Sequence, residues 1–195
     1  MLKVKVILGS TREGRFGEQP AKWITEKAKQ KGLDVELLDL RDFPLPFFKE
    51  AVTPSYKKEA YADPAVVQWT AKIKEADAFV VIAAEYNHSF TAVLKNAIDY
   101  VSPEWNKKSV GFVGYGTVGG ARAIEQLRLV FAELQTVAVR TGVYMISPWT
   151  MLDEKGILDT SSFDAAGDMM LEQLVWWGEA LKVARDKDAA ANAVA

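Results

Sequence analysis

The sequence KVKVILGSTREGRFG, residues 3–17, decides the fold class. Its first six residues, Lys3 to Leu8, are mostly β-branched and apolar, as in a strand, and a polar loop punctuated by glycines follows at once. A helix is predicted from about Glu18, with Pro20 in its first turn and Gly32 as its stop. The order strand, loop, helix is typical of the opening unit of a parallel α/β sheet.

The same order repeats along the rest of the chain. Further strands are predicted at 34–40, 77–84 and 109–114 and within 136–146, with helices at 63–76, 91–101, 121–135 and 161–185. Five strands that alternate with helices predict a doubly wound parallel sheet with helices on both faces, because each right-handed crossover places a helix over the sheet. We find no internal repeat or interdomain linker, so we expect one domain over 1–187 and a flexible tail over 188–195.

Two features lie outside this pattern. Residues 41–61 carry Pro44, Pro46 and Pro54, which exclude a regular element through most of the segment. A loop of this length is either a lid or contact loop, or a flexible connector. The pair Trp176-Trp177 is expected to pack the last helix or a subunit interface rather than to stack on a cofactor.

Composition narrows the classes of function. The 195 residues are 49% hydrophobic and 26% charged, and the net charge of −2 provides no global attraction to nucleic acid or to an anionic membrane. With no cysteine and one histidine, neither disulfides nor a metal site are expected. The longest apolar run, Ala78 to Ala84, is too short for a membrane helix, and Lys3 and Lys5 interrupt any signal-peptide core. We therefore expect a cytoplasmic protein.

The loop after the first strand has the chemistry of a phosphate site. It offers the hydroxyls of Ser10 and Thr11, the guanidinium groups of Arg12 and Arg15, and a helix N-terminus, which together favour an anion. The alternative is a solvated surface turn. No Gly-Lys-Ser/Thr sequence closes the loop, so it is not a nucleotide-hydrolysing P-loop, and a phosphomonoester without a metal ion fits better.

The loop after the fourth predicted strand, residues 114–119, matches the pattern G-x-G-x-x-G. A dinucleotide-binding turn also needs an acidic residue at the end of the next strand, but the nearest acid at a suitable distance, Glu133, falls inside a predicted helix. Glycines remove side-chain bulk, so this pattern favours a close approach to a flat ring or to a neighbouring subunit.

The loop after the third predicted strand, residues 84–90, gathers polar and aromatic groups. Its backbone N–H groups are suited to a heteroaromatic ring, with Tyr86 covering part of the ring surface. His88 is either a general acid or base, or a loop histidine without a catalytic role, and the second interpretation is preferred because no nucleophile or partner acid stands at a recognised spacing. No G-x-S-x-G nucleophile turn occurs.

With these loops placed, the sequence resembles the NADPH-dependent FMN reductase family. Gly9-Ser10-Thr11-Arg12 with Arg15 resembles its FMN-phosphate loop, and residues 85–89 resemble its ring-binding motif, which residues 95–100 continue into the next helix. Residues 114–120 fall where the family has its second ring-side loop. Two departures are Ala84 for the usual proline and Arg15-Phe16-Gly17 for the common Ser-Phe-Asn; here a guanidinium is expected to take over a hydroxyl's role.

The resemblance implies a flavodoxin-like sheet of order 2-1-3-4-5 and an FMN-dependent oxidoreductase. It would pass a hydride from NADPH, with NADH as an alternative, to the flavin and then reduce a flavin, quinone or similar planar acceptor, as a homodimer or homotetramer. No side chain is expected to be catalytic. The expected cofactor-binding residues are Ser10, Arg12, Arg15, Phe16, Gly17, Glu85, Tyr86, Asn87, His88, Gly114, Tyr115 and Gly116. The alternatives are a flavodoxin-like electron carrier or a non-catalytic binding module on the same fold.

Overall fold

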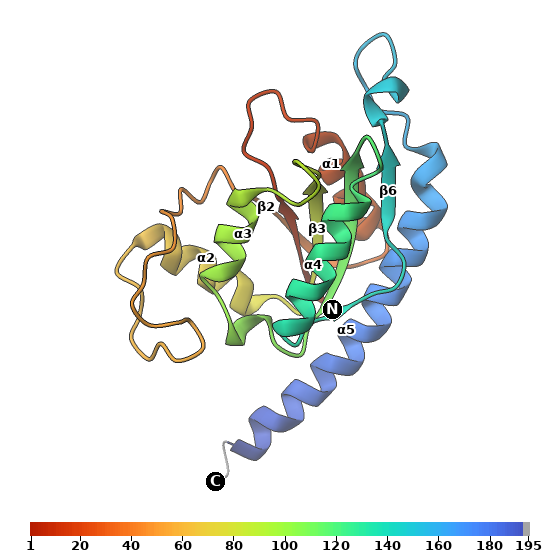
Figure 1. The fold of residues 1–195 in the computed structure, drawn as a ribbon. Helices are drawn as coiled ribbons and strands as arrows, with labels where there is room; N and C mark the ends of the chain where they lie inside the picture. Colours follow the sequence, from red (N-terminus) through yellow and green to blue (C-terminus); the bar gives the residue numbers. More distant parts are fainter. Residues whose placement is uncertain (193–195) are drawn as a thin grey trace.

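The sheet of this protein is built from parallel strands and confirms the expected order (Figure 1). The computed structural model describes residues 1–192, and in these the strands follow one another in space as β2-β1-β3-β4-β5, with β6 also paired to β4. The strands are β1 (Lys3–Leu8), β2 (Asp34–Asp39), β3 (Ala78–Ala84), β4 (Ser109–Gly116), β5 (Val137–Ala138) and β6 (Val143–Ile146). Every residue of β3 is buried, as its unbroken apolar sequence predicts for a central strand.

The expected fifth strand is divided into two pieces. Both β5 and β6 pair in parallel with β4, but the chain leaves the ladder between them. There the carbonyl groups of Val139 and Arg140 accept hydrogen bonds from the Arg128 side chain (2.7 and 2.9 Å), and the Thr141 N–H donates to Gln173 (3.0 Å). Side chains thus replace the ladder as partners of the backbone, which explains why a continuous strand is not needed.

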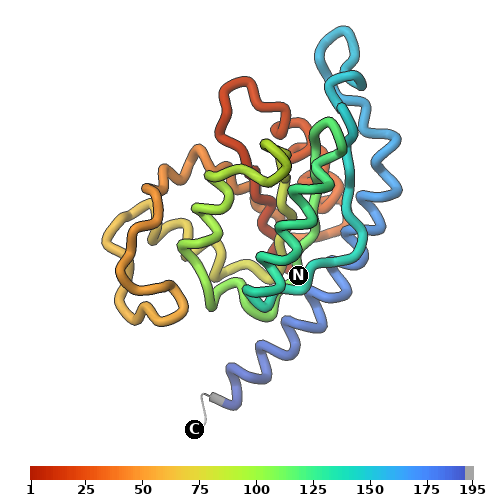
Figure 2. Tube along the Cα trace, in the orientation of Figure 1, coloured from red at the N-terminus to blue at the C-terminus, as the bar shows by residue number. Residues whose placement is uncertain are grey.

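The helices form two layers, one on each face of the sheet (Figures 1 and 2). They are α1 (Glu18–Gln30), α2 (Pro64–Glu75), α3 (Ala92–Asp99), α4 (Ala121–Glu133) and α5 (Asp164–Asn192). One apolar core lies between the sheet and α2, α3 and α4, and a second lies between the sheet and α1 and α5. The first residues of two predicted helices act as caps, since Asp63 accepts the N–H of Ala65 (2.8 Å) and Thr91 accepts that of Leu94 (3.2 Å).

Helix α5 is longer than the sequence predicts. It begins at Asp164 and continues to Asn192 instead of ending at Arg185, and residues 193–195 of the expected tail lie outside the described residues. Its C-terminal part projects beyond the sheet (Figure 2). Trp176 is 64% exposed and Trp177 40% exposed, so the pair does not pack α5 onto the sheet; the alternative expectation, a subunit interface, stays a prediction. Within residues 1–192 no helix combines the length and apolar character of a membrane span.

Two irregular segments flank the carboxyl edge of the sheet. The proline-rich segment after β2 contains no helix or strand, in agreement with the sequence, and its residues 43–48 lie against α3. Residues 147–160 project above the sheet in Figure 1, and the sequence predicts no helix or strand there. Gln19 of α1 holds this projection, because its amide donates to the Gly156 carbonyl (2.9 Å) and accepts the Leu158 N–H (2.6 Å).

Candidate functional site

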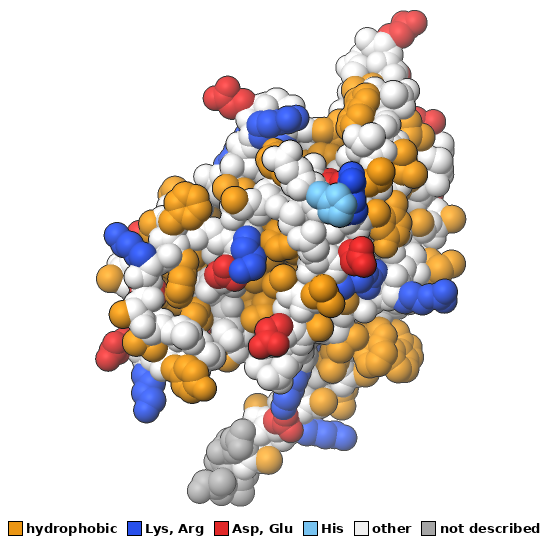
Figure 3. Space-filling model, viewed as in Figure 1, with side chains coloured by type: hydrophobic (Ala, Val, Ile, Leu, Met, Phe, Trp, Pro, Cys, Tyr) orange, Lys and Arg blue, Asp and Glu red, His pale blue; other side chains and the backbone are white. Residues whose placement is uncertain are grey.

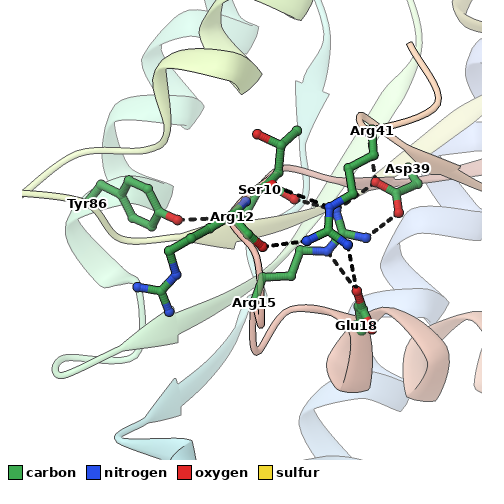
Figure 4. A network of polar contacts seen from close by, with 8 residues as sticks. Ser10, Arg12, Arg15, Glu18, Asp39, Arg41 and Tyr86 are labelled. Atoms are coloured by element: carbon green, nitrogen blue, oxygen red, sulfur yellow. Dashed lines mark hydrogen bonds and ion pairs between the residues drawn. The ribbon is translucent and has the colours of Figure 1, made fainter. Parts of the chain in front are cut away.

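The three loops singled out in the sequence meet at the carboxyl edge of the sheet. Ser10 of the first loop hydrogen-bonds through its hydroxyl to the Tyr86 hydroxyl of the second (3.0 Å; Figure 4). The Glu85 N–H donates to the Tyr115 carbonyl at the end of β4 (3.2 Å), and the Phe16 and Tyr115 ring centroids are 5.6 Å apart. Ser10 and Tyr86, which are 76 positions apart in the chain, are thus brought into one site, at the point where the strand order reverses.

Two arginines fix the orientation of the first loop. The carbonyl of Ser10 accepts a hydrogen bond from Arg15 Nη1 (2.5 Å), and the carbonyls of Thr11 and Arg12 accept from Arg41 (3.3 and 2.6 Å). Because a trans peptide unit points its C=O and the following N–H in opposite directions, the amides that follow are turned to the other side of the loop.

Apart from the Arg12 N–H, which donates to the Ser10 hydroxyl (3.5 Å), the amides of residues 10–14 have no acceptor among the described residues. Among residues 1–192, no acceptor is found for the backbone N–H groups of Ser10, Thr11, Glu13 and Gly14. Several N–H groups that converge without an acceptor form an anion site, and the N-terminus of α1 adds its dipole. The structure therefore favours the phosphate interpretation of this loop over the solvated turn.

The two arginines of the loop itself point in different directions (Figure 4). The Arg15 side chain is 3% exposed, and its guanidinium contacts both carboxylate oxygens of Asp39 and also Glu18 Oε1 (3.1 Å). The Arg12 side chain extends toward Tyr86, and its guanidinium has no partner among the described residues. Arg12 is thus free to bind a ligand, whereas the geometry favours a positioning role for Arg15 over the direct contact expected from the sequence.

The carboxylate of Asp39 completes this arrangement. Burial would raise the pKa of Asp39, but the hydrogen bonds from Arg15 and from the Arg41 N–H (2.9 Å) outweigh burial and hold the pKa below its usual range. The hydrogen bonds to Asp39 raise the pKa of Arg15 despite its burial. Both groups are charged at neutral pH, and the pair ties the end of β2 to the first loop.

The loop after β3 is a tight turn that exposes two amides. Tyr86 and Ser89 exchange backbone hydrogen bonds (2.8 and 3.0 Å), and the central residues Asn87 and His88 both have positive φ angles, 48° and 75°. This is the left-handed pair that a two-residue turn of this kind requires. No described residue accepts the N–H groups of Asn87 and His88, which leaves them available to a ligand such as a heteroaromatic ring.

Helix α4 holds this turn in place. The Glu85 carboxylate is 5% exposed and pairs with the Arg122 guanidinium (Nε to Oε1, 2.5 Å), while Gln126 donates to the His88 carbonyl (2.8 Å) and accepts from the Ser89 hydroxyl (2.6 Å). Glu85 therefore positions the loop, and only its backbone remains for a ligand. The His88 side chain is exposed, and the interpretation without a catalytic role stays a prediction.

The glycine pattern after β4 has an internal explanation. The strand continues to Gly116, so Gly114, Tyr115 and Gly116 belong to its end rather than to a loop. A Cβ on Gly114 would lie 2.6 Å from the Gly119 carbonyl, and one on Gly120, whose φ is 73°, would lie 2.7 Å from the Tyr115 N–H. The glycines thus allow the strand end to cross the start of α4 at backbone contact.

The side chain of Tyr115 lies between the loops. Burial raises the pKa of Tyr115 to about 12, so its hydroxyl is protonated at neutral pH and is a hydrogen-bond donor. The half-buried Phe16 ring packs against the Tyr115 ring. A Cβ on Gly17 would come within 2.7 Å of the Tyr115 hydroxyl oxygen. Phe16 and Gly17 therefore form a packed floor at the helix entry. In the part of the chain that the structure describes, no cluster of three or more His, Cys, Asp or Glu could hold a metal ion.

Comparison with known proteins agrees with this geometry. The family model described as NADPH-dependent FMN reductase matches residues 2–150. The chain belongs to the NADPH-dependent FMN reductase family. An NAD(P)H-dependent FMN reductase of Pseudomonas aeruginosa is 32% identical over 185 residues, 89% of this chain and 91% of that protein. This confirms the resemblance inferred from the sequence.

The match to another member covers less of both chains, and solved structures confirm the fold. An NAD(P)H-dependent FMN reductase of Schizosaccharomyces pombe is 37% identical over 129 residues, which is 66% of this chain and 64% of that protein, so the chain matches about two thirds of it. The flavoenzyme NAD(P)H:(acceptor) oxidoreductase FerB of Paracoccus denitrificans has a TM-score of 0.72 at 23% identity, covering 92% of this chain and 98% of its own. The flavodoxin-like fold is thereby confirmed.

The residues that hold the loops in place were not predicted from the sequence. Asp39 and Arg41 orient the first loop, Arg122 and Gln126 hold the second, and Thr91 both caps α3 and donates to the Gly9 carbonyl. The local sequence carried one usable signal, Thr91 as a helix cap. The others act on residues more than 20 positions away, and only the fold brings them together.

Proposed function

We propose that the protein binds FMN at this edge and uses it to transfer electrons from NADPH or NADH to a small planar acceptor. The observation that carries the proposal is the row of carbonyls held by Arg15 and Arg41, which turns unpartnered amides into the first loop. These amides and the free Arg12 guanidinium suit the doubly charged phosphate of FMN, since charged hydrogen bonds are the strong ones.

Different residues would bind different parts of the cofactor. The amides of Ser10, Thr11, Glu13 and Gly14 and the Arg12 guanidinium would hold the phosphate, and Phe16 and Gly17 shape the entry to α1. The amides of Asn87 and His88 would bind the polar edge of the ring, and the Tyr86 side chain would cover part of it. The chemistry that FMN supplies when bound is acceptance of a hydride from a nicotinamide and release of two electrons to an acceptor.

The amides at this edge also have an electrostatic role. Fixed N–H dipoles stabilise negative charge that develops on a reduced ring, and because they are already oriented they cost no reorganisation during the reaction. No acid or base on the chain is needed for hydride transfer. We expect flavins, quinones and similar planar molecules as acceptors, because each of them can lie flat against an exposed flavin ring.

Anaerobic mixing with NADPH or NADH tests the proposed activity. The FMN-loaded protein should lose its visible flavin absorbance within seconds of mixing with one of the two nucleotides, because the nicotinamide reaches the exposed ring. Reoxidation by added quinone should restore the absorbance. An electron carrier would stay oxidised for minutes with both nucleotides, and a non-catalytic module would not take up FMN at all; either result refutes the reductase activity.

We also propose that the protein works as a dimer or tetramer. The support is an exposed apolar stripe on α5, where Met169 (53%), Trp176 (64%) and Val183 (55%) recur at intervals of seven residues and thus share one helix face. Figure 3 shows apolar side chains gathered along this side of the molecule. Light scattering should give a multiple of the 21.6 kDa chain mass, and Trp176→Glu should lower it. A monomer at micromolar concentration would contradict this.

A further inference from the structure

A side-chain hydrogen bond joins the turn after β3 to the first loop. The Tyr86 side chain reaches from the turn across the site, and its hydroxyl oxygen lies 3.0 Å from the Ser10 hydroxyl oxygen (Figure 4). Tyr86 is 38% exposed, whereas Ser10 is only 1% exposed. The sequence predicts that the Tyr86 ring covers part of a flavin, which leaves the Tyr86 hydroxyl without a role. The contact with Ser10 indicates one.

Both ends of this hydrogen bond are held in place by other contacts. Tyr86 exchanges backbone hydrogen bonds with Ser89 across the turn, and α4 holds the turn. On the other side, the carbonyl of Ser10 accepts a hydrogen bond from Arg15 (2.5 Å). Because both groups are already fixed, the hydrogen bond between their hydroxyls orders little that was free. The two hydroxyls therefore meet before a ligand arrives.

The hydrogen-bonding capacity of Ser10 gives the contact a direction. A hydroxyl group has one hydrogen to donate and two lone pairs that accept. The Arg12 N–H donates to the Ser10 hydroxyl (3.5 Å) and so uses one of the lone pairs. An anion in the loop only accepts, so Ser10 donates its hydrogen to the anion and Tyr86 becomes the donor to Ser10. The Tyr86 hydroxyl thereby orients the Ser10 hydroxyl toward the anion.

The groups proposed to bind the phosphate lie close to this hydrogen bond. The Arg12 side chain extends toward Tyr86 (Figure 4), and the N–H of Ser10 itself has no acceptor within residues 1–192. Because Ser10 is buried, water competes little for its hydroxyl hydrogen. In such surroundings consecutive hydrogen bonds strengthen one another. A chain of donors from Tyr86 through Ser10 to a phosphate oxygen therefore fits the geometry.

We propose that Tyr86 is a positioning residue for the flavin phosphate, because its hydroxyl donates to Ser10 and orients the Ser10 hydroxyl toward that phosphate. The inference rests on the proposed function and adds a basis for selectivity to it. Riboflavin has no phosphate, so it gains nothing from the oriented hydroxyl. Tyr86 thus helps the site to select the phosphorylated flavin, although it belongs to the turn that would bind the ring. A hydrogen bond that only fixed the turn would favour both flavins equally.

Fluorescence titration with FMN and with riboflavin tests this role in wild type, Ser10→Ala, Tyr86→Phe and the double variant. Ser10→Ala should weaken FMN binding about tenfold and Tyr86→Phe about fivefold, while riboflavin binding changes less than about twofold. The double variant should bind FMN no more weakly than Ser10→Ala, because Tyr86 acts through Ser10. Tyr144→Phe is the matched control, which should leave FMN binding unchanged. Tyr144 lies on β6, is similarly exposed (41%), and its hydroxyl has no hydrogen-bond partner among the described residues.

Three results would overturn the proposal. Equal losses of FMN and riboflavin affinity in Tyr86→Phe would show that the hydrogen bond only fixes the turn. Losses of FMN affinity that multiply in the double variant would show that Tyr86 acts independently of Ser10, and unchanged FMN binding to Tyr86→Phe would show that its hydroxyl has no role. A failure of the proposed function is seen separately, as wild-type protein that takes up no FMN or that stays oxidised with NADPH and NADH.

Discussion

Arg12→Ala should weaken FMN binding about 10- to 100-fold and leave riboflavin binding nearly unchanged. Arg12 is the guanidinium of the first loop that has no partner among the described residues, and hydrogen bonds to a charged group contribute roughly 1.5 to 3 kcal/mol. Riboflavin has the same ring but no phosphate, so the difference between the two ligands isolates the phosphate contact. Quenching of flavin fluorescence gives both dissociation constants.

Lys22→Ala is the matched control for Arg12. It removes one positive charge from an exposed position of α1, close to the loop in sequence. FMN binding to this variant should be weakened less than about twofold, because an exposed charge at a distance is screened by salt. Equal losses of FMN and riboflavin affinity in Arg12→Ala would show that the first loop does not hold the phosphate.

Arg15→Met should lower the free energy of unfolding by about 3 kcal/mol and weaken FMN binding as well. The Arg15 guanidinium is almost fully buried and Asp39 is 23% exposed, so removing one partner leaves a largely buried carboxylate unpaired. The loss also frees the Ser10 carbonyl, and with it the orientation of the amides that follow. Urea unfolding and FMN titration of the same variant measure the two effects.

The double variant Arg15→Met/Asp39→Asn separates positioning from direct contact. Removing both charges should recover much of the lost stability, since the unpaired carboxylate is gone. If Arg15 only positions the loop, part of the FMN affinity should return with the stability. Recovery of stability without any recovery of FMN affinity would instead show that the guanidinium contacts the phosphate.

The stability of the protein at acid pH gives a second test of the Arg15–Asp39 ion pair. Because the pKa of Asp39 is lowered in the folded protein, its contribution to stability is fully present above the ordinary pKa of 3.8 and is lost as the pH falls through the lower folded value. The wild-type protein should therefore lose stability in this range more steeply than the double variant. Parallel curves would mean that Asp39 is not ionised in the pair.

The sequence predicted the sheet because each strand carries its own signal. β1 and β3 are short apolar runs that end at polar loops, and Asp63 and Thr91 cap the helices at the expected positions. The division of the edge strand into β5 and β6 was not predicted, because it depends on Arg128 and Gln173 from distant helices. The length of α5 was not predicted either. An alanine-rich, charged sequence also does not reveal where a projecting helix ends.

The candidate site was predicted as a set of loops but not as an arrangement. Residue types identified the phosphate loop, yet Arg15 and Arg12 look alike in the sequence and differ only because Asp39 stands beside one of them. Likewise, the sequence predicts that Glu85 binds the ring, but in the structure the Glu85 carboxylate is paired with Arg122. The assignment of the cofactor contacts, the domain boundary at residue 187 and the cytoplasmic location stay predictions.

The structure of the protein crystallised with FMN tests the central claim most directly. We predict the phosphate within hydrogen-bond distance of the Ser10–Gly14 amides and the Arg12 guanidinium, and the ring between Tyr86–His88 and Tyr115. A phosphate bound away from the first loop, or a ring that does not touch the turn after β3, would contradict the account.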